Sequence, residues 1–549
     1  MKKKYIPLVF LGIAVFSLTA CEQVMDMFTP GNGATYSYRE IPVDIPTPNP
    51  GNTKARKSSY TYKDYTENNA AVISSTPCVG EAKLLVIPVW FSNSAAFIDP
   101  SKKDSVKEDI EKAYFGTNED TGWRSVKTYY EEESHGALKI DGAVSDWYEI
   151  SGQHSAYIPS DSGLTLTTSL VTDAVSWYFN NHTSESRKDY DCDEDGYLDG
   201  VMLIYAAPDY DTLGIKDAER NKQTNLWAYC FWTQNGGNVA NPIANAFFWA
   251  SYDFMYGSEK ATARTGKAYK NGDTSIVDID THTYIHEMGH MFGLTDYYDY
   301  SEKGYSPAAG FSMQDSNVGG HDPFSSFSLG WGKAYVPTET TNINLKKFAS
   351  TGEMIVLTPS WNENNSAFDE YLVLEYYDTE NNNLNSLDTT SKYMPGKKYP
   401  EGTKDRGIRL WHVDGRLLYN AKGNPNYSSS RITTNPRIPG YKVVSLCSNT
   451  YYDGKNGESD YLSPLFKEDI KYGNYNILQL IRNDKTAGYQ QKDSLTSAML
   501  FKKGEEFSMS VYGKQFVNTG KFNNGSELGF TFKVNALNSN YASITVTKL

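Results

Sequence analysis

The sequence predicts an α+β protein in which a twisted, mixed sheet with helices is followed by a β-sandwich-like C-terminal region. Its 549 residues exceed what one hydrophobic core normally organises, so two or three folded units are expected. Up to about residue 207, apolar strand-like runs alternate with helical stretches, which favours a mostly parallel layer. Beyond about residue 341, short β-branched or aromatic runs alternate with Asn, Gly and Asp turns, as in antiparallel sheets.

The expected elements follow in order along the chain. Strands are expected at residues 82–91, 138–150 and 200–207, and helices at 104–115, 125–134 and 165–179. Further strands are expected at 371–377, 408–413, 441–446 and 542–546, with a long loop near 380–392. Four regions result: a leader at 1–20, a linker at 21–70, an α/β domain at 71–340, and one or two β-rich domains at 341–549.

The N-terminus predicts an exported bacterial lipoprotein. Lys2–Lys4 precede the apolar run Ile6–Ala20, which is too short for a comfortable membrane helix. Leu18–Cys21 resembles a lipobox, after which Cys21 would carry lipid and anchor the protein to the outer membrane or cell surface. An uncleaved anchor and an ordinary signal peptide are the alternatives. Residues 21–70 are rich in Pro, Gly and Asn and are expected to form a tether or a propeptide.

The charge balance narrows the possible partners. A formal net charge of −14 excludes a nucleic-acid binder, because phosphate binding requires a basic surface. No other apolar run reaches 18 residues, so we expect membrane contact only through Cys21. A protein or peptide substrate and a monomeric state are expected.

The most informative motif is His286-Glu287-Met288-Gly289-His290. Residues four apart in a helix lie one turn apart on one face, so both imidazoles can reach one cation. Glu287 lies about 100° round the helix, beside the metal, where its carboxylate can accept a proton from water. Gly293 stands where a left-handed residue ends a helix, and Asp278 and Asp280 offer capping oxygens at its start.

Asp296 is the expected third metal ligand. The nearest downstream glutamate, Glu302, lies in a Gly/Ser/Tyr-rich loop and is a poor candidate. In the metzincin pattern H-E-x-x-H-x-x-G-x-x-H the last residue returns to the metal, and here that position holds Asp296. The sequence thus predicts zinc on His286, His290 and Asp296. Met313 is expected beneath the metal as in a methionine turn, with ordinary core packing as the alternative.

Three other histidines are expected to stay outside the metal site. His282 lies one turn before His286, but a fourth protein ligand would close the open position that water needs. It is expected beside the ligands or facing solvent. His321 and His412 are expected to be structural.

A second ion site is predicted between residues 191 and 199. Carboxylates of Asp191, Asp193, Asp195 and Asp199, with a carbonyl from Tyr197, match the first nine positions of a calcium loop. Gly196 supplies its tight turn. Position twelve is Met202 instead of glutamate, so the loop is no EF-hand. A structural Ca²⁺ is expected, and a solvated acidic turn is the alternative.

The cysteines leave several possibilities open. Besides Cys21, the chain has the four cysteines Cys78, Cys192, Cys230 and Cys447. They can form two disulfides in an oxidising compartment or remain free. Cys78 precedes the first strand, and a thiolate blocking the zinc is a further alternative.

The histidine motif and several other segments of the chain together resemble the immune inhibitor A-like secreted bacterial metallopeptidases, whose motif is H-E-x-x-H-x-x-G-x-x-D. The resembling segments appear in family order and span about residues 82–415: SVKTYYEEESHGAL (125–138), DYDCDEDGYLDGVMLIY (189–205), LWAY (226–229), DYYD (296–299), FSSFSLGW (324–331), YLVLEYYD (371–378) and RGIRLWHVD (406–414). The resemblance implies an endopeptidase with zinc and structural calcium, an N-terminal extension and β-rich domains behind the catalytic one.

The expected function is zinc-dependent endopeptidase activity on extracellular proteins. Glu287 would assist attack of a zinc-bound water on the peptide bond and return the proton to the leaving amine. The alternative is a surface binding or adhesion lipoprotein with a structural metal. Such sites prefer four protein ligands and have no use for a glutamate beside an open position.

Overall fold

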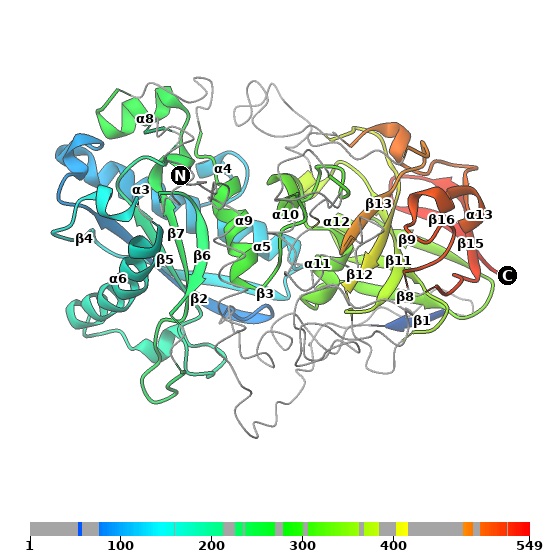
Figure 1. Ribbon diagram of the computed structural model, residues 1–549, viewed down its shortest axis with the longest axis horizontal. Helices are drawn as coiled ribbons and strands as arrows, with labels where there is room; N and C mark the ends of the chain where they lie inside the picture. The colour runs from blue at the N-terminus through cyan, green and yellow to red at the C-terminus, as the bar shows by residue number, and fades with distance from the viewer. Residues whose placement is uncertain are drawn as a thin grey trace, which may run out of the picture.

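The computed structural model describes fourteen parts of the chain, and within them the protein forms three β-sheets (Figure 1). These parts are residues 53–56, 76–158, 160–210, 212–213, 226–233, 236–268, 278–299, 306–361, 367–383, 402–415, 449, 476–486, 495–523 and 525–549. The predicted leader, Cys21 and the strand expected at 441–446 lie outside them. In the described residues, no helix combines the length and apolarity needed to cross a membrane.

The first sheet lies in the N-terminal half and is mixed but mostly parallel. Its strands, in spatial order, are β3 (Leu138–Val144), β2 (Gly80–Trp90), β5 (Gly200–Tyr205), β7 (Ala246–Ser251) and β6 (Tyr229–Trp232), and the short β4 (Tyr148–Glu149) also pairs with β2. The first four run parallel to their neighbours, and β6 alone is antiparallel. The strands expected at 82–91, 138–150 and 200–207 are confirmed.

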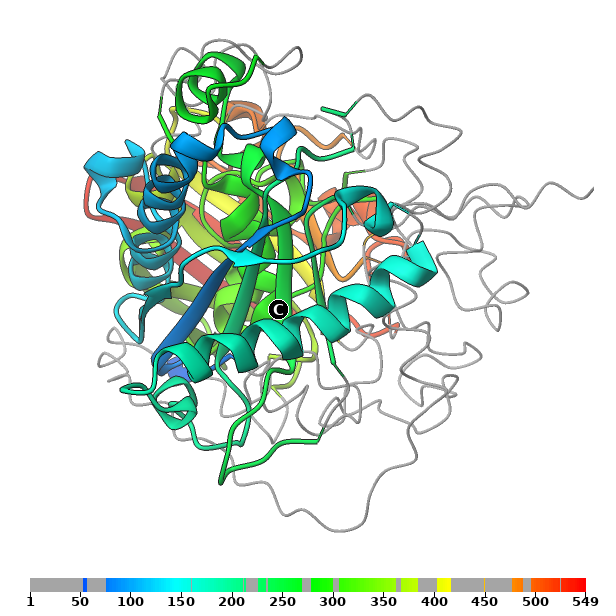
Figure 2. The ribbon, with the colours of Figure 1, turned by 90° about the vertical axis from the view of Figure 1, so that its left-hand side faces the viewer.

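Helices cover both faces of this sheet. The helices on or beside it are α3 (Lys103–Phe115), α4 (Asn118–Thr121), α5 (Val126–Glu133), α6 (Ser160–Asn181), α8 (Ser258–Thr265) and α9 (His282–Met291). Two short helices follow: α10 (Met313–Ser316) contacts α9, and α11 (Pro323–Ser328) contacts a strand of the C-terminal region. Alternate residues of β2 face opposite sides: Leu85 shares a core with Val171 and Val175 of α6, whereas Val86 shares another with α3, α5 and α9. Figure 2 shows α6 lying across the outer face.

The C-terminal region contains two sheets. One has the order β1 (Thr53–Arg56), β8 (Lys333–Pro337), β10 (Glu353–Leu357), β11 (Glu370–Tyr377), β12 (Gly407–Asp414), β13 (Leu478–Ile481). The other has the order β14 (Glu506–Phe507), β15 (Phe530–Leu537), β16 (Tyr541–Lys548), β9 (Thr341–Lys346), and the short helices α12 (Phe348–Thr351) and α13 (Met509–Tyr512) lie nearby in sequence. The strands expected at 371–377, 408–413 and 542–546 are β11, β12 and β16.

The six-stranded sheet of the C-terminal region, which contains β10 to β13, is buried on both faces. On β10, Ile355 and Leu357 join a core shared with the four-stranded sheet, whereas Met354 and Val356 join the core that also contains α3, α5 and α9. Each face therefore packs on a different layer. In Figure 1 the helices α9, α10 and α11 accordingly lie between the N-terminal sheet and the two C-terminal sheets.

Two strands differ from the expected region boundaries. Thr53–Arg56 falls within the segment 21–70 predicted as a tether or propeptide, yet it pairs antiparallel with β8 as an edge strand. Strand β8 itself precedes residue 341 but belongs to the C-terminal sheet. Main-chain pairing along a sheet edge needs little apolar side-chain area, so the composition of residues 53–56 gave no sign of it.

Candidate metal centre and cleft

Helix α9 carries the histidine motif and ends where the sequence predicts. Its apolar residues Ile285 and Met288 are buried, as is Phe292 just beyond its end. Gly293 follows with φ +95°, a conformation that favours glycine, and Leu294 N donates to Gly289 O at 3.1 Å. At the other end the N-cap is Thr281, without a side-chain bond. Asp280 instead accepts from His282 N at 3.0 Å.

The three predicted zinc ligands converge on one point. Nε2 of His286 lies 3.0 Å from Oδ1 of Asp296, and Nε2 of His290 lies 3.3 Å from the same oxygen. All three donor atoms lie within 4.8 Å of one another. Two imidazole nitrogens and one carboxylate oxygen are a donor set that suits zinc, and three protein ligands leave one position for substrate.

Backbone carbonyls fix the orientation of both imidazoles. His286 Nδ1 lies 2.7 Å from Met313 O, and His290 Nδ1 lies 2.8 Å from Leu294 O. A carbonyl only accepts, so each Nδ1 carries the proton and each Nε2 presents its lone pair to the metal position. Met313 is fully buried at the start of α10. Its observed contribution to the site is this carbonyl.

Gly289 lies directly against the side chain of Gln314 on α10. A Cβ atom at that position would lie 2.2 Å from Oε1 of Gln314, so the glutamine side chain would have to move. The glycine therefore lets Gln314 approach the helix, and Gln314 O accepts from Tyr297 N at 2.8 Å. This contact fixes the backbone next to Asp296.

The pKa values of Asp296 and Glu287 are shifted in opposite directions. Burial alone would raise the pKa of Asp296, but His290 and His286 hold that pKa well below its usual range. Burial raises the pKa of Glu287, and the two imidazoles oppose that shift. A carboxylate with a raised pKa is well suited to accept and return a proton near neutral pH.

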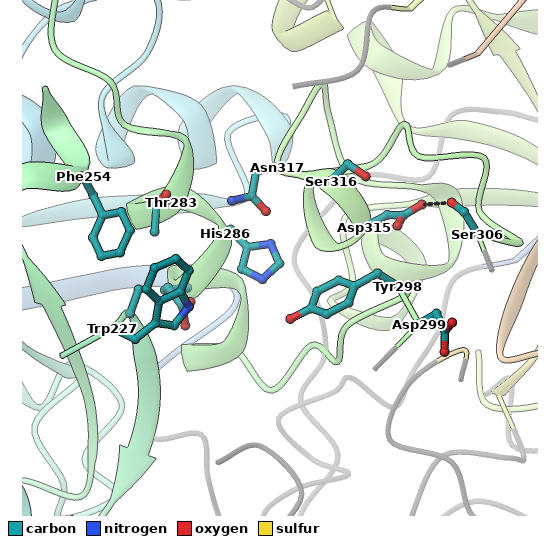
Figure 3. Close-up of a pocket in the computed structure, with 12 residues that line it drawn as sticks. Trp227, Phe254, Thr283, His286, Tyr298, Asp299, Ser306, Asp315, Ser316 and Asn317 are labelled. Carbon is teal, nitrogen blue, oxygen red and sulfur yellow. Dashed lines mark hydrogen bonds between the residues drawn. The ribbon is translucent and has the colours of Figure 1, made fainter. Parts of the chain in front are cut away.

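The metal centre opens into a cleft of about 300 Å³ (Figure 3). It is lined by Trp227, Ala228, Phe254, Thr283, His286, Glu287, Tyr298, Asp299, Ser306, Asp315, Ser316 and Asn317. Figure 3 shows Trp227 and Phe254 on one side, and Tyr298, Asp299 and Asp315 on the other. The cleft thus places Trp227 and Phe254 opposite a more polar wall, with His286 between them.

Tyr298 is a site residue that the sequence did not identify. Its ring centroid lies 6.4 Å from that of His286, and the residue is 36 % exposed. Burial, the carboxylates of Asp296 and Glu287, and a side-chain hydrogen bond with Asp296 raise the pKa of Tyr298 well above its usual value. The hydroxyl therefore stays protonated and can donate a hydrogen bond. The only sequence signal was its place two residues after Asp296 in a chain rich in tyrosine.

Residues 82–321 match the model of one protein family, which is described as immune inhibitor A peptidase M6, catalytic domain. The chain contains a metallopeptidase domain of this family. The matched segment includes the three converging ligands, Glu287 and the acidic loop, and it confirms the resemblance inferred from the sequence. No curated protein matches the chain.

The acidic loop of this peptidase domain gathers three of its four aspartates. Carboxylate oxygens of Asp191, Asp193 and Asp195 lie within 4.8 Å of one another. Asp191 also accepts from Asp195 N at 3.0 Å and from Gly196 N at 3.1 Å, while Gly196 turns the chain with φ +88°. The predicted clustering therefore holds for positions one, three and five of the loop.

Asp199 and Tyr197, the other two predicted ligands, are tied to nearby backbone. Asp199 is fully buried and accepts from Cys192 N at 3.0 Å and from Lys83 N at 2.7 Å, so it joins the loop to β2. Its carboxylate is not among the three that cluster within 4.8 Å. Tyr197 N donates to Asp195 Oδ1 at 2.9 Å, and Tyr197 forms a parallel bridge with Ile243.

The remaining histidines of the peptidase lie outside the metal centre. His282 is buried against Trp123, with ring centroids 4.2 Å apart, and its Nδ1 lies 2.9 Å from Asp280 Oδ1. It is thus neither a ligand nor solvent-facing. His321 is buried among aromatic rings, and His412 pairs with Glu370 at 3.0 Å.

Among the described cysteines, Cys192 and Cys230 are free thiols, and Cys447 lies outside the described residues. Cys78 is fully buried at the start of the N-terminal sheet, where its carbonyl accepts from Trp331 Nε1 at 2.6 Å. It therefore does not block the metal in this structure. Cys230 lies on β6 and donates from Sγ to Glu287 O at 3.0 Å.

Proposed function

We propose that this protein is a zinc-dependent endopeptidase that hydrolyses peptide bonds of extracellular proteins. The observation that carries the proposal is the convergence of His286, His290 and Asp296 at the edge of a cleft that Glu287 also lines. A structural zinc site would close with a fourth protein ligand, whereas this set leaves a position open.

Glu287 is the proposed general base and acid. When bound, zinc would supply a Lewis acid that polarises the substrate carbonyl and lowers the pKa of nearby water. The Glu287 carboxylate accepts the proton of the attacking water and then delivers it to the leaving amine nitrogen. Its burial supports this role, because a raised pKa lets the carboxyl hold the proton between the two steps.

Tyr298 and β6 are proposed to hold the substrate. The Tyr298 hydroxyl faces the cleft and donates to the negative oxygen that forms on the scissile carbonyl. Strand β6 ends the N-terminal sheet, and in the described residues its outer edge has no strand partner. A peptide in extended form can pair with such an edge. The sulfhydryl contact between Cys230 and Glu287 O brings that edge beside the metal helix.

The Glu287→Gln variant tests the mechanism. We expect cleavage of denatured casein to fall by at least about 10²- to 10⁴-fold, the usual contribution of a general base, while zinc content stays near one per chain. Gln keeps the size of the side chain, so loss of activity without loss of zinc isolates the proton transfer. Retained activity would refute the role of Glu287. A wild-type protein that is inert with and without a zinc chelator would favour the binding-protein alternative.

Tyr298→Phe tests the oxyanion contact separately. Removing one such donor lowers kcat by roughly 10²- to 10³-fold in other hydrolases, and we expect kcat to fall far more than KM rises. Zinc affinity is measured in parallel, because the hydroxyl also hydrogen-bonds the proposed ligand Asp296, and kcat is compared at full zinc loading. An unchanged kcat would remove Tyr298 from the mechanism.

Calcium and the membrane anchor belong to the same proposal. The clustered carboxylates of Asp191, Asp193 and Asp195 support a structural Ca²⁺, because like charges so close repel strongly without a cation. We further propose export as a monomeric lipoprotein anchored at Cys21 to the outer membrane or cell surface. Mass spectrometry of the purified N-terminus tests this: a lipidated Cys21 supports it, and an unmodified Cys21 or an uncleaved leader contradicts it.

A further inference from the structure

The part of the chain that carries Asp296 and Met313 forms one wall of the metal centre. We call residues 296–299 and 306–320 the ligand wall. It provides the third ligand and the carbonyl that orients His286. The wall does not stand on the N-terminal sheet alone, because residues beyond 341 bond to it at several points.

Asn449 supports the wall directly beside Asp296. Its side chain is fully buried and donates from Nδ2 to Tyr297 O at 3.1 Å. The same nitrogen donates to Leu478 O at 2.8 Å, and Oδ1 accepts from Ile477 N at 2.9 Å. Asn449 therefore ties the peptide that follows Asp296 to the start of β13.

The residue after Asp296 is held on all its polar atoms. Besides the bond to Asn449, Tyr297 N donates to Gln314 O at 2.8 Å, and its hydroxyl lies 2.9 Å from Ser325 Oγ. A backbone fixed in this way leaves the Asp296 carboxylate little freedom to leave the two imidazoles. Asn449 is the contributor to this arrangement that comes from the C-terminal region.

Asn383 supports the other half of the wall, beneath His286. It lies in the short helix η6 (Asn381–Asn383), and its Oδ1 accepts from Gly320 N at 3.1 Å. Gly320 O in turn accepts from Met313 N at 3.3 Å, and Met313 O holds His286 Nδ1. Asn383 is therefore linked to His286 through the backbone hydrogen bond between Gly320 and Met313.

Two further contacts join the same surfaces. Leu480 N of β13 donates to Pro307 O at 2.9 Å. Arg409 Nη1 of β12 lies 3.4 Å from Phe311 O, while its guanidinium pairs with Glu375 and stacks on the ring of Tyr377. The wall is thus bonded to β12 and β13 along its length. All the C-terminal partners lie beyond residue 321, where the family match ends.

We propose that the C-terminal β region completes the metal centre, with Asn449 as a positioning residue for Asp296 and Asn383 as a positioning residue for His286. The inference rests on the proposed zinc site. Partners behind metal ligands orient them, and losing one typically lowers metal affinity or activity by about 10- to 100-fold. The C-terminal region therefore contributes to metal affinity as well as to stability.

Zinc affinity of the full chain tests the proposal. We would compare Asn449→Ala and Asn383→Ala with the wild type by competition against a chelator, and record the visible absorption of the Co²⁺-loaded proteins. We expect roughly 10-fold weaker zinc binding in each variant and a shifted Co²⁺ spectrum. A merely structural loss would lower the unfolding temperature without changing the spectrum of the folded, loaded protein.

Asn483→Ala is the matched control. Asn483 also lies in the C-terminal region and donates from Nδ2 to Leu500 O at 3.1 Å and to Glu505 at 2.7 Å, but it does not contact the ligand wall. It should lose stability and keep its zinc affinity. Where Asn449→Ala does not fold, Asn449→Asp replaces it, since its second oxygen repels Tyr297 O. Where Asn383→Ala does not fold, Asn383→Leu replaces it, since it removes the acceptor of Gly320 N at similar side-chain size.

The outcomes separate the proposal from the function on which it rests. Weaker zinc binding in the Asn449 or Asn383 variant, absent from Asn483→Ala, supports the positioning role of that residue. Wild-type affinity and spectrum in both folded variants overturn the inference while leaving the zinc site in place. A wild-type chain that binds no zinc overturns the proposed function itself.

Discussion

The metal centre and the acidic loop are built in opposite ways. The acidic loop draws its three clustered carboxylates from Asp191–Asp195 and closes through its own backbone amides. The metal centre takes its ligands from His286–Asp296, but its orientation depends on Met313 and, further away, on Asn383 and Asn449. When one short loop supplies all the clustered groups, the spacing of residues in the sequence can reveal the cluster. When distant backbone atoms orient the ligands, the sequence can reveal the ligands but not the atoms that orient them.

The largest expected effect comes from removing the third ligand. Asp296→Ala leaves two imidazoles without their carboxylate partner, so we expect zinc affinity to fall by more than about 100-fold, beyond the range for outer partners, and peptidase activity to disappear. Metal analysis after dialysis and a casein assay measure the two effects. Asp193→Asn in the acidic loop serves as the control and should keep zinc. A zinc-replete Asp296→Ala protein would show that another residue is the third ligand.

The next effect distinguishes the loop from a merely solvated turn. We expect Ca²⁺ to raise the thermal unfolding temperature of the wild type, because binding to the folded state alone stabilises it by about 2.7 kcal/mol at a hundredfold excess over Kd. The double change Asp193→Asn and Asp195→Asn should abolish this rise while zinc content is unchanged. An equal response to Ca²⁺ in the double variant would place calcium elsewhere in the chain.

A smaller, pH-dependent effect is expected where α5 meets the C-terminal region. Glu133 accepts from His321 N at 2.8 Å and from Asn382 Nδ2 at 2.7 Å, and burial raises the pKa of Glu133 from 4.5 to about 8. The folded protein then keeps this proton after the unfolded chain has released it. Its contribution to stability is complete below pH 4.5 and is lost as the pH rises toward 8, by at most about 1.4 kcal/mol per pH unit.

The Glu133→Gln variant isolates that dependence. Urea unfolding of zinc-loaded protein at pH 5.5 and pH 7.5 should show a smaller loss of stability with rising pH in the variant than in the wild type. The difference between the two proteins is the measured quantity, since other groups titrate in both. Identical slopes would mean that Glu133 is not protonated in the folded state.

The smallest effect concerns Met313. Its carbonyl, and not its thioether, contacts His286, so Met313→Leu keeps the observed bond. A volume-conserving core change usually costs less than about 1.5 kcal/mol, and kcat should remain within a few-fold of the wild type. A large loss of activity in a folded, zinc-loaded variant would assign a function to the sulfur.

The sequence predicted those parts of the site in which side-chain identity and spacing determine the geometry. His286, Glu287, His290, Gly293 and Asp296 lie within eleven residues. Helical geometry places the first three, and the motif's turn after Gly293 predicts that Asp296 returns to them. Seven of the sixteen strands in the described residues, β2 to β5, β11, β12 and β16, followed from apolar or alternating runs. In the acidic loop, spacing suggested Asp199 as a ligand, but it did not reveal that this carboxylate accepts from the backbone amides of Cys192 and Lys83.

The rest depended on atoms or pairings that leave no mark in the sequence. Every residue has a backbone carbonyl, so the sequence does not show that those of Met313 and Leu294 orient the two histidines. Nine strands of the described residues, β1, β6 to β10 and β13 to β15, were not predicted, although Trp227 and Ala228, just before β6, line the cleft. Edge pairing of β1 and the amide of Asn449 likewise join segments more than a hundred residues apart.

The six-stranded sheet of the C-terminal region, covered on both faces, also has a consequence for cleavage of the peptidase by itself. Its Val356 and Trp411 face the peptidase domain, while Ile355 and Leu410 face the other way. Shedding the C-terminal region would expose that apolar face to water, which is strongly unfavourable. A single cut in a surface loop between the two halves should therefore leave a nicked but assembled enzyme. After self-cleavage, denaturing gels would therefore show shorter fragments, while the N-terminal and C-terminal parts would still migrate together under native conditions.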